Sequence, residues 1–223
     1  MRPGRSVWTA FLLLAMLGAA QAAPPEEAIR PSERYKNERA RTLAVTYGIQ
    51  LRQIYDAIYR CHEWVHIRKE GLGFRTPKAV AEDSLYLTLW VWIDQQMTPA
   101  FAAAPAHQRA SAMLQQYGID LLRQLSSHRA FFQEAAMTGF GVVLTWIKPG
   151  GEPGRDAPGV NEALAFFVDK VTLHQFLGRE TRPAQFVERA IISGFDGKRE
   201  LGRLPLEISH RGPPGTADGQ PAC

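Results

Sequence analysis

The clearest hydrophobic pattern in the chain lies in its first third. Apolar side chains recur there at alternating spacings of three and four residues, which places them on one stripe of an α-helix. Ser32 is a good N-cap, and the glycines and proline of GLGFRTP end the pattern near Gly71. The spacing therefore predicts a long helix over residues 32–71. Its apolar stripe consists of Ala44, Tyr47, Leu51, Ile54, Ile58, Cys61 and Val65.

A second pattern, SLYLTLWVWID at residues 84–94, alternates from one residue to the next. Leucine, valine and isoleucine occupy one side, while Tyr86, Thr88, Trp90 and Trp92 occupy the other. Strict alternation with apolar residues on both sides is typical of a strand buried on both faces. The flanking segments KAVAED and QQM also suit a buried helix, but the aromatic and β-branched content favours the strand.

The rest of the chain mixes helical and strand patterns. Residues 107–128 recover helical spacing. The strand-like runs GFGVVLTWIKPG and NEALAFFVDKV flank a Gly/Pro-rich loop, which predicts an antiparallel hairpin with a long tip. TRPAQFVERAII predicts a helix with Pro183 in its first turn, FDGK a tight turn, and LPLEI a last strand. Together these elements predict an α+β fold, with a long N-terminal helix and further helices packed on a mainly antiparallel sheet.

The N-terminus has the features of a secretory signal peptide over residues 1–22. Arg2 and Arg5 precede an apolar run, and Ala20-Gln21-Ala22 supplies small residues before a cleavage site. The run is shorter than the ~20 residues that span a bilayer. We therefore expect a soluble, exported protein, periplasmic or extracellular. It would have a linker at 23–31, a single α+β domain at 32–208 and a flexible Pro/Gly-rich tail at 209–223.

Charge indicates no particular class of partner. The chain has 26 basic and 22 acidic residues, and loss of the first 22 residues removes two arginines and no acid. The mature chain then has 24 basic against 22 acidic residues, a formal charge of +2. The basic cluster at 30–41 is interrupted by Glu33 and Glu38, as on a solvated helix face. We therefore expect no nucleic-acid partner.

The two cysteines, Cys61 and Cys223, leave two alternatives open. Export would place both where disulfides persist, and a bond between them would close a very long loop. Cys61 also lies on the apolar stripe, where a free buried thiol is common. The sequence does not choose between these states.

One short motif carries candidate chemistry. His62-Glu63-Trp64-Val65-His66 has the form HExxH, which on a helix directs two imidazoles to one side. The segment thus resembles the HExxH zinc metallopeptidases. The resemblance implies a zinc-dependent hydrolase in which His62 and His66 bind zinc and Glu63 acts as general base. Glu82, with Asp83 beside it, is the candidate third ligand.

The surroundings of the motif differ from that family. Arg60 and Arg68 flank it, Leu72 occupies the position of a third histidine, and no recognisable second motif contains Glu82. The aromatic residues Trp90, Trp92, Trp146, Phe166 and Phe167 stand at strand spacing, which is more typical of a core than of a ligand cleft.

Two functions from different classes follow. The first is a binding or interaction module without catalytic chemistry or cofactor, with a protein partner on the N-terminal helix. The alternative is the zinc hydrolase. The stripe from Ala44 to Val65 would either pack on the protein's own sheet or pair with a partner helix.

Overall fold

A computed structural model describes residues 25–78, 80–81, 83–94, 98–150 and 161–210 of the chain. The predicted signal peptide, most of the Gly/Pro-rich hairpin tip, Glu82 and Cys223 lie outside these residues.

Within the described ranges, six strands form one sheet whose spatial order follows the order of the strands along the chain. Neighbouring strands are antiparallel except β2 and β3, which are parallel. The predicted combination of helices with a mainly antiparallel sheet is thus confirmed. The strands are β1 (Val65–Arg75), β2 (Tyr86–Ile93), β3 (Gly139–Ile147), β4 (Asn161–Asp169), β5 (Ile191–Phe195) and β6 (Glu200–Gly202).

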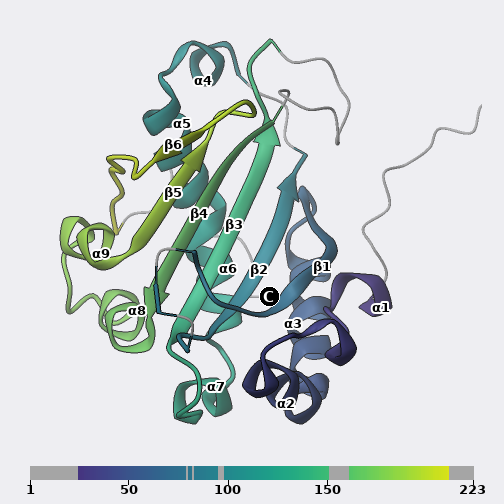
Figure 1. Cartoon of the computed structure of the whole chain (residues 1–223). Coiled ribbons are helices and arrows are strands. Elements are labelled where there is room, and N and C mark those ends of the chain that lie inside the picture. Colours follow the sequence, from purple (N-terminus) through teal and green to yellow (C-terminus); the bar gives the residue numbers. More distant parts are fainter. Residues whose placement is uncertain (1–24, 79, 82, 95–97, 151–160, 211–223) are drawn as a thin grey trace, which may run out of the picture.

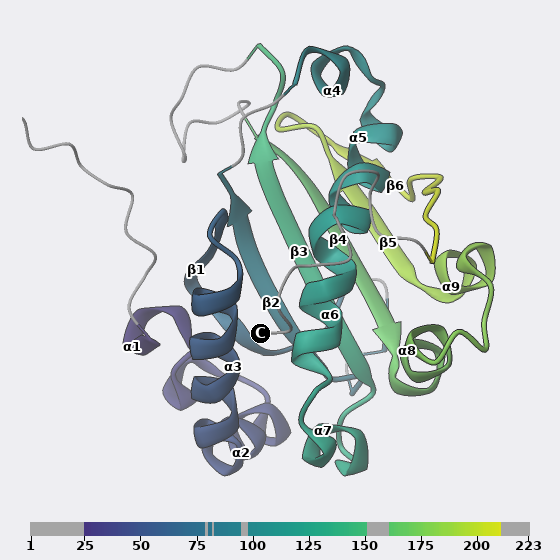
Figure 2. The same cartoon turned by 180° about the vertical axis from the view of Figure 1, so that it is seen from behind.

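Several helices gather on one face of the sheet, as Figure 2 shows. Figure 1 looks onto the opposite face, and none of the described helices lies in front of β3 or β4 there. We call these the helix-covered face and the helix-free face. The first carries α3 (Gly48–Cys61), α5 (Ala106–Met113), α6 (Ile119–Leu125), α8 (Lys170–Leu177) and α9 (Pro183–Arg189).

Further helical elements complete the described chain. They are α1 (Pro25–Ala28), η1 (Ser32–Arg34), α2 (Glu38–Thr46), α4 (Pro99–Ala103), η2 (Leu114–Gly118) and α7 (Arg129–Gln133). Lys170 Nζ, at the start of α8, donates hydrogen bonds to the carbonyl oxygens of Phe132 and Glu134, at the end of α7.

The single long helix predicted over 32–71 is not found. Ser32 begins the short η1 turn, and the N-cap of α2 is Asn37, whose side-chain oxygen accepts a hydrogen bond from Ala40 N at 3.1 Å. The helical path is interrupted at Tyr47, between α2 and α3, next to a glycine. Glycine is a weak helix former, so the break falls where propensity is low.

The second half of that prediction is wrong because strand β1 occupies residues that the helix was expected to contain. Helix α3 ends at Cys61, and Val65 pairs with Ile93 of β2. The register between β1 and β2 shifts between Ile67 and Leu72, and Glu70 in this bulge has a φ of 53°. Before the bulge the inward-facing residues of β1 have odd numbers (Val65, Ile67), and after it they have even numbers (Leu72, Phe74). The sequence of β1 therefore lacks the regular alternation that would predict a strand.

The apolar stripe packs on the protein's own sheet, the first of the two alternatives. Leu51, Ile54 and Ile58 are at most 1% exposed and belong to the same core as the strands. The strand side chains of this core on the helix-covered face include Leu87, Leu144, Leu164 and Phe166. The stripe itself is therefore not available to a partner helix.

Several other predictions are confirmed. Segment 84–94 contains β2, buried along almost its whole length, and the predicted hairpin is formed by β3 and β4. The helical segment 107–128 contains α5 and α6, joined by the π-helical turn η2. Pro183 starts α9, and the FDGK turn joins β5 to β6 with Gly197 at a φ of 84°.

Three details of the prediction are wrong. LPLEI is not a strand, since β6 is formed by Glu200–Gly202 just before it. The strand predicted over NEALAFFVDKV ends at Asp169, and its last two residues, Lys170 and Val171, belong to α8. The Asp169 carboxylate accepts a hydrogen bond from Thr172 N at 2.8 Å and caps that helix. The predicted linker is part of the fold, because Ala28 is fully buried and Arg30 N donates to Leu72 O at 2.9 Å.

The first residues of the predicted tail contact the folded domain, and Cys61 is bonded. Ser209 N donates to the side-chain oxygen of Gln115 at 2.6 Å, and the His210 ring stacks on Phe176 with centroids 5.0 Å apart. Cys61 is a disulfide cysteine, and the described residues contain no free cysteine. The sequence has only one other cysteine, Cys223.

Candidate functional site

The HExxH segment does not form a helical pair of imidazoles. His62 is the C-cap of α3, Glu63 and Trp64 form a turn, and His66 lies in β1. The zinc hypothesis required both histidines on one helix face, so the structure removes the geometry on which it rested.

The two histidine rings also have different partners. His62 Nε2 lies 3.1 Å from the side-chain oxygen of Gln124 on α6. His66 Nε2 lies 3.9 Å from a carboxylate oxygen of Asp94. Within the described residues, which exclude Glu82, no group of three or more histidine, cysteine, aspartate or glutamate side chains could hold a metal ion.

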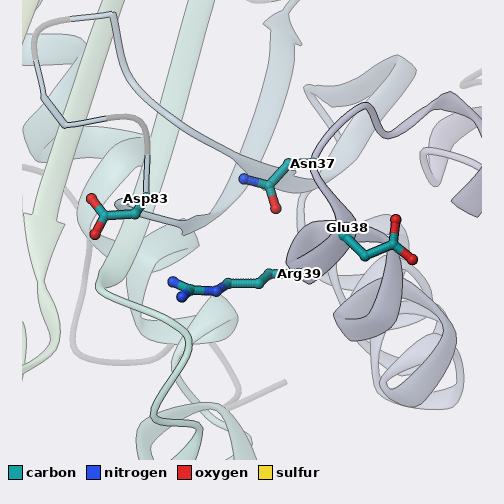
Figure 3. Close-up of a pocket in the computed structure, with 4 residues that line it drawn as sticks. All are labelled: Asn37, Glu38, Arg39 and Asp83. Carbon is teal, nitrogen blue, oxygen red and sulfur yellow. The ribbon is translucent and has the colours of Figure 1, made fainter.

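Asp83, the neighbour of the proposed third ligand, lines a shallow pocket beside the start of α2. The pocket has a volume of about 330 Å³ and is also lined by Asn37, Glu38 and Arg39. Figure 3 shows the Arg39 guanidinium directed toward Asp83, with the Glu38 carboxylate turned away. All three charged residues are exposed. Exposed charges of both signs without a buried nucleophile or base do not constitute a catalytic arrangement.

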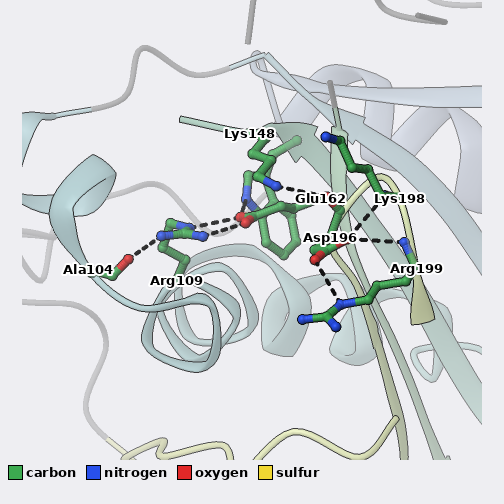
Figure 4. A network of polar contacts seen from close by, with 8 residues as sticks. Ala104, Arg109, Lys148, Glu162, Asp196, Lys198 and Arg199 are labelled. Carbon is green, nitrogen blue, oxygen red and sulfur yellow. Dashed lines mark hydrogen bonds and ion pairs between the residues drawn. The ribbon is translucent and has the colours of Figure 1, made fainter. Parts of the chain in front are cut away.

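A buried polar network joins α5 to β4 on the helix-covered face. Arg109 donates two hydrogen bonds to the Glu162 carboxylate, one of them from Nε to Oε2 at 2.8 Å (Figure 4). Trp146 Nε1 donates to the same Oε2 at 2.9 Å, and Arg109 also donates to Ala104 O. Glu162 is only 2% exposed, and each of its oxygens has a donor. Because its partners are all protein groups, we assign this network to structure.

The helix-free face presents partly exposed side chains in a continuous row. Trp90 pairs with Val143, Val143 with Ala165, and Ala165 with Ser193, so the row crosses four strands. All four residues are partly exposed. Beside the row, Ala163 is partly exposed and Phe195 is 42% exposed. We call these residues the platform: Trp90, Val143, Ala163, Ala165, Ser193 and Phe195.

Another part of the same face contains glycines that lie under aromatic rings. A Cβ atom on Gly141 would collide with the Phe167 ring, and one on Gly139 would collide with the backbone at Val168 and approach Tyr86. The rings of Tyr86 and Phe167 meet edge to face with centroids 5.7 Å apart. Tyr86 and Phe167 are 5% and 8% exposed, so this part of the helix-free face is itself buried, and the glycine and aromatic pairs stabilise the strands there.

Trp90 is held in a defined orientation at one end of the platform. Its Nε1 donates to Thr145 Oγ1 at 3.0 Å, which fixes the indole across two strands. The Arg68 guanidinium lies over the indole at 4.6 Å from the ring centroid, within the range of cation–π attraction. The platform therefore combines a fixed aromatic ring, small side chains and a cation at its border.

The sequence prediction treated the strand aromatic residues as core, and this is confirmed for four of the five. Trp92, Trp146, Phe166 and Phe167 are at most 8% exposed. Trp90 is the exception and is partly exposed. Its alternation with leucine and valine was visible in the sequence, but the absence of a covering helix was not.

Comparison with known proteins finds no relative: no family model matches the chain, and neither a curated protein nor a solved structure is similar to it. Among the described helices, none is both long enough and apolar enough to cross a membrane.

Proposed function

We propose that this chain is an exported, non-catalytic binding protein whose platform docks on a protein partner. The observation that carries the proposal is the row of partly exposed side chains that crosses β2, β3, β4 and β5 on the helix-free face. The strands are rigid because their other face is the core. Small and aromatic side chains on a sheet that is packed on its other face suit a protein interface, in which aromatic anchors supply much of the binding energy.

This surface replaces the N-terminal helix as the proposed site of the partner. The inner stripe of α3 is buried in the core. Val45, Ile49 and Tyr59 on the outer side of α2 and α3 are exposed, but Tyr59 only stacks on Tyr55 within its own helix. Isolated apolar residues are normal on surfaces, whereas contiguous apolar patches more often mark interaction sites.

The test is site-specific photo-crosslinking in the cell that makes the protein. A photoreactive phenylalanine analogue at Ala165 should give a discrete cross-linked product, and the second substitution Ala163→Arg should abolish it. The same analogue at Ile49, which is 74% exposed on α3, is the matched control and should give no such product. A product of equal yield from both positions, or none from Ala165 in a protein exported at normal levels, would contradict the proposal.

Export is tested separately. Cleavage of the signal peptide after Ala22 predicts a mature N-terminus at Ala23. Mass spectrometry of the protein purified from the envelope or the medium measures this directly. A full-length chain confined to the cytoplasm would overturn the exported location without affecting the platform itself.

A further inference from the structure

Three arginines gather beside strand β1, at a place that the platform does not include. Arg30 and Arg34 come from the N-terminal segment that runs along the edge of the sheet, where Ile29 bridges to Leu72. Arg75 is the last residue of β1. The Arg30 Cβ lies 3.1 Å from the position that a Cβ on Gly73 would occupy, so Arg30 packs on the strand face that also carries Arg75.

The N-terminal segment is fixed against β1 by Tyr35. The Tyr35 hydroxyl accepts a hydrogen bond from Phe74 N at 3.1 Å, and the ring covers Gly73. The Arg30 guanidinium lies over this ring, 5.0 Å from its centroid. Arg30 and Arg75 are therefore held near one another by ordered structure and are both only partly exposed.

The hydrogen bonds of these arginines leave donors unused. Arg30 Nη2 donates to Arg34 O at 2.8 Å, and Arg75 Nη2 donates to Glu70 O at 2.5 Å. Within the described residues, Arg30 Nε and Arg75 Nε are buried and have no acceptor. Buried donors without an acceptor are rare in folded proteins, because each costs desolvation free energy that nothing offsets.

The charges of the cluster are also unbalanced. Glu70 is the acidic member, and its Oε1 lies 3.7 Å from Arg34 Nε. Three guanidiniums against one carboxylate leave a net charge of +2. Burial and the neighbouring charge of Arg30 lower the pKa of Arg75, and the opposing effects of Tyr35 and Glu70 are smaller. The fold thus holds like charges together at a cost.

We propose that the cluster of Arg30, Arg34 and Arg75 binds a dianionic tetrahedral oxyanion, either free phosphate or a phosphate monoester. Two negative charges match the net charge of the cluster, and planar guanidiniums bind such oxygens in a bidentate manner. The bound anion removes the repulsion between Arg30 and Arg75. This site does not depend on the proposed protein-binding platform, and either can fail alone.

The first experiment is a titration of the full mature chain with inorganic phosphate at constant ionic strength, followed by NMR of the arginine Nε–H groups. Saturable shifts of the Arg30 and Arg75 signals are expected, while the Trp90 Nε1–H on the platform stays unchanged. A parallel titration with glycerol phosphate separates an esterified ligand from a free one by its relative affinity. Acetate binding as tightly as either phosphate would overturn the assignment of a dianion.

Substitutions that remove a positive or a negative charge from the cluster should change the affinity for phosphate in opposite directions. Arg75→Gln is expected to weaken phosphate binding about tenfold, as for loss of a charged hydrogen bond. Glu70→Gln is expected to strengthen it by roughly two- to fivefold, because a competing, partly buried carboxylate is removed. Arg123→Gln, which alters an exposed arginine on α6, is the matched control and should change nothing.

Arg34→Gln provides a second weakening variant if Arg75→Gln does not fold, since the Arg34 side chain is 69% exposed. A purely structural cluster would show no saturable shift, or an affinity that is the same in Arg34→Gln, Glu70→Gln and wild type. Either result would overturn the proposal.

Discussion

The two faces of strand β3 differ sharply although their side chains alternate along the same nine residues. On the helix-covered face, Phe140, Val142, Leu144 and Trp146 are at most 1% exposed and are locked beneath helices. On the helix-free face, Gly139 and Gly141 lie under aromatic rings, and Val143 is partly exposed. One face is thus fully buried beneath helices, whereas the other is buried around Thr145 and Phe167 and partly exposed around Val143.

The largest expected effect on stability concerns the buried Arg109–Glu162 ion pair, which is polar although it lies on the otherwise apolar helix-covered face. Arg109→Ala should lower the free energy of unfolding by about 3–5 kcal/mol, because it leaves the buried Glu162 carboxylate without its cation. Urea unfolding measures this. Arg123→Ala, which breaks the exposed pair with Asp120, should cost no more than about 1 kcal/mol. Equal losses in the two variants would contradict the structural role of the Arg109 pair.

The next prediction compares neighbouring residues on opposite faces. Leu144→Ala should cost about 2–5 kcal/mol, because it opens a cavity in a fully buried site. Val143→Ala, one residue earlier on the helix-free face, should cost less than about 1 kcal/mol, since its side chain is only partly buried. Chemical denaturation of both variants tests the contrast. Similar losses would show that the helix-free face is also a packed core.

The glycines beneath the aromatic rings give a smaller effect. Gly141→Ala should cost about 1–3 kcal/mol, because the added Cβ displaces the Phe167 ring. Thermal unfolding and near-UV circular dichroism report the stability and the ring packing. Gly48→Ala is the matched control, since nothing lies within 4 Å of its Cβ position and alanine is the better helix former. If both substitutions stabilised the protein, the ring would not be seated on Gly141.

The smallest expected effect on stability depends on pH and concerns a hydrogen bond that belongs to neither face of the sheet. Tyr47 donates a hydrogen bond to Glu134 Oε2 at 2.8 Å. Hydrogen bonds from Ala136 N and from Tyr47 lower the pKa of Glu134 below its ordinary 4.5. A depressed carboxyl pKa means that this stabilisation is present above the unfolded pKa and is lost as the pH falls through the folded pKa.

Tyr47→Phe should therefore cost about 0.5–1.5 kcal/mol at neutral pH, the net contribution of one hydrogen bond. Urea unfolding of variant and wild type as the pH is lowered below 4.5 should show this difference shrinking. Phenylalanine keeps the ring contact with Phe131, so a difference that stays constant down to acid pH would mean that the ionised Glu134 carboxylate is not the partner of the Tyr47 hydroxyl.

The elements that the sequence predicted are those whose hydrophobic period runs uninterrupted. Strand β2 alternates without a break, and the β3–β4 hairpin has turn residues between two apolar runs. Strand β1 was missed because its bulge resets the alternation between Ile67 and Leu72, while Val65 continues the helical spacing of α3. Local periodicity cannot show where a chain changes from one regular structure to another.

The candidate surfaces depend still more on tertiary structure. The HExxH motif could be read from the sequence, but the zinc-site hypothesis required that both histidines lie on one helix. Helix α3 ends one residue before His62. The platform requires knowledge of which sheet face lacks a helix, and the arginine cluster joins residues from the N-terminal segment and the end of β1. The alternation of side chains along one strand shows neither which sheet face lacks a helix nor which distant segments lie side by side.

The parallel pairing of β2 with β3 divides the sheet into two antiparallel parts with short-range connections. The β1–β2 and β3–β4 connections are both much shorter than the crossover 94–138, so these hairpins can close before the β2–β3 ladder forms. Folding should therefore proceed by docking of two preformed halves. In pulsed hydrogen exchange, amides shared by β3 and β4 should gain protection before those shared by β2 and β3.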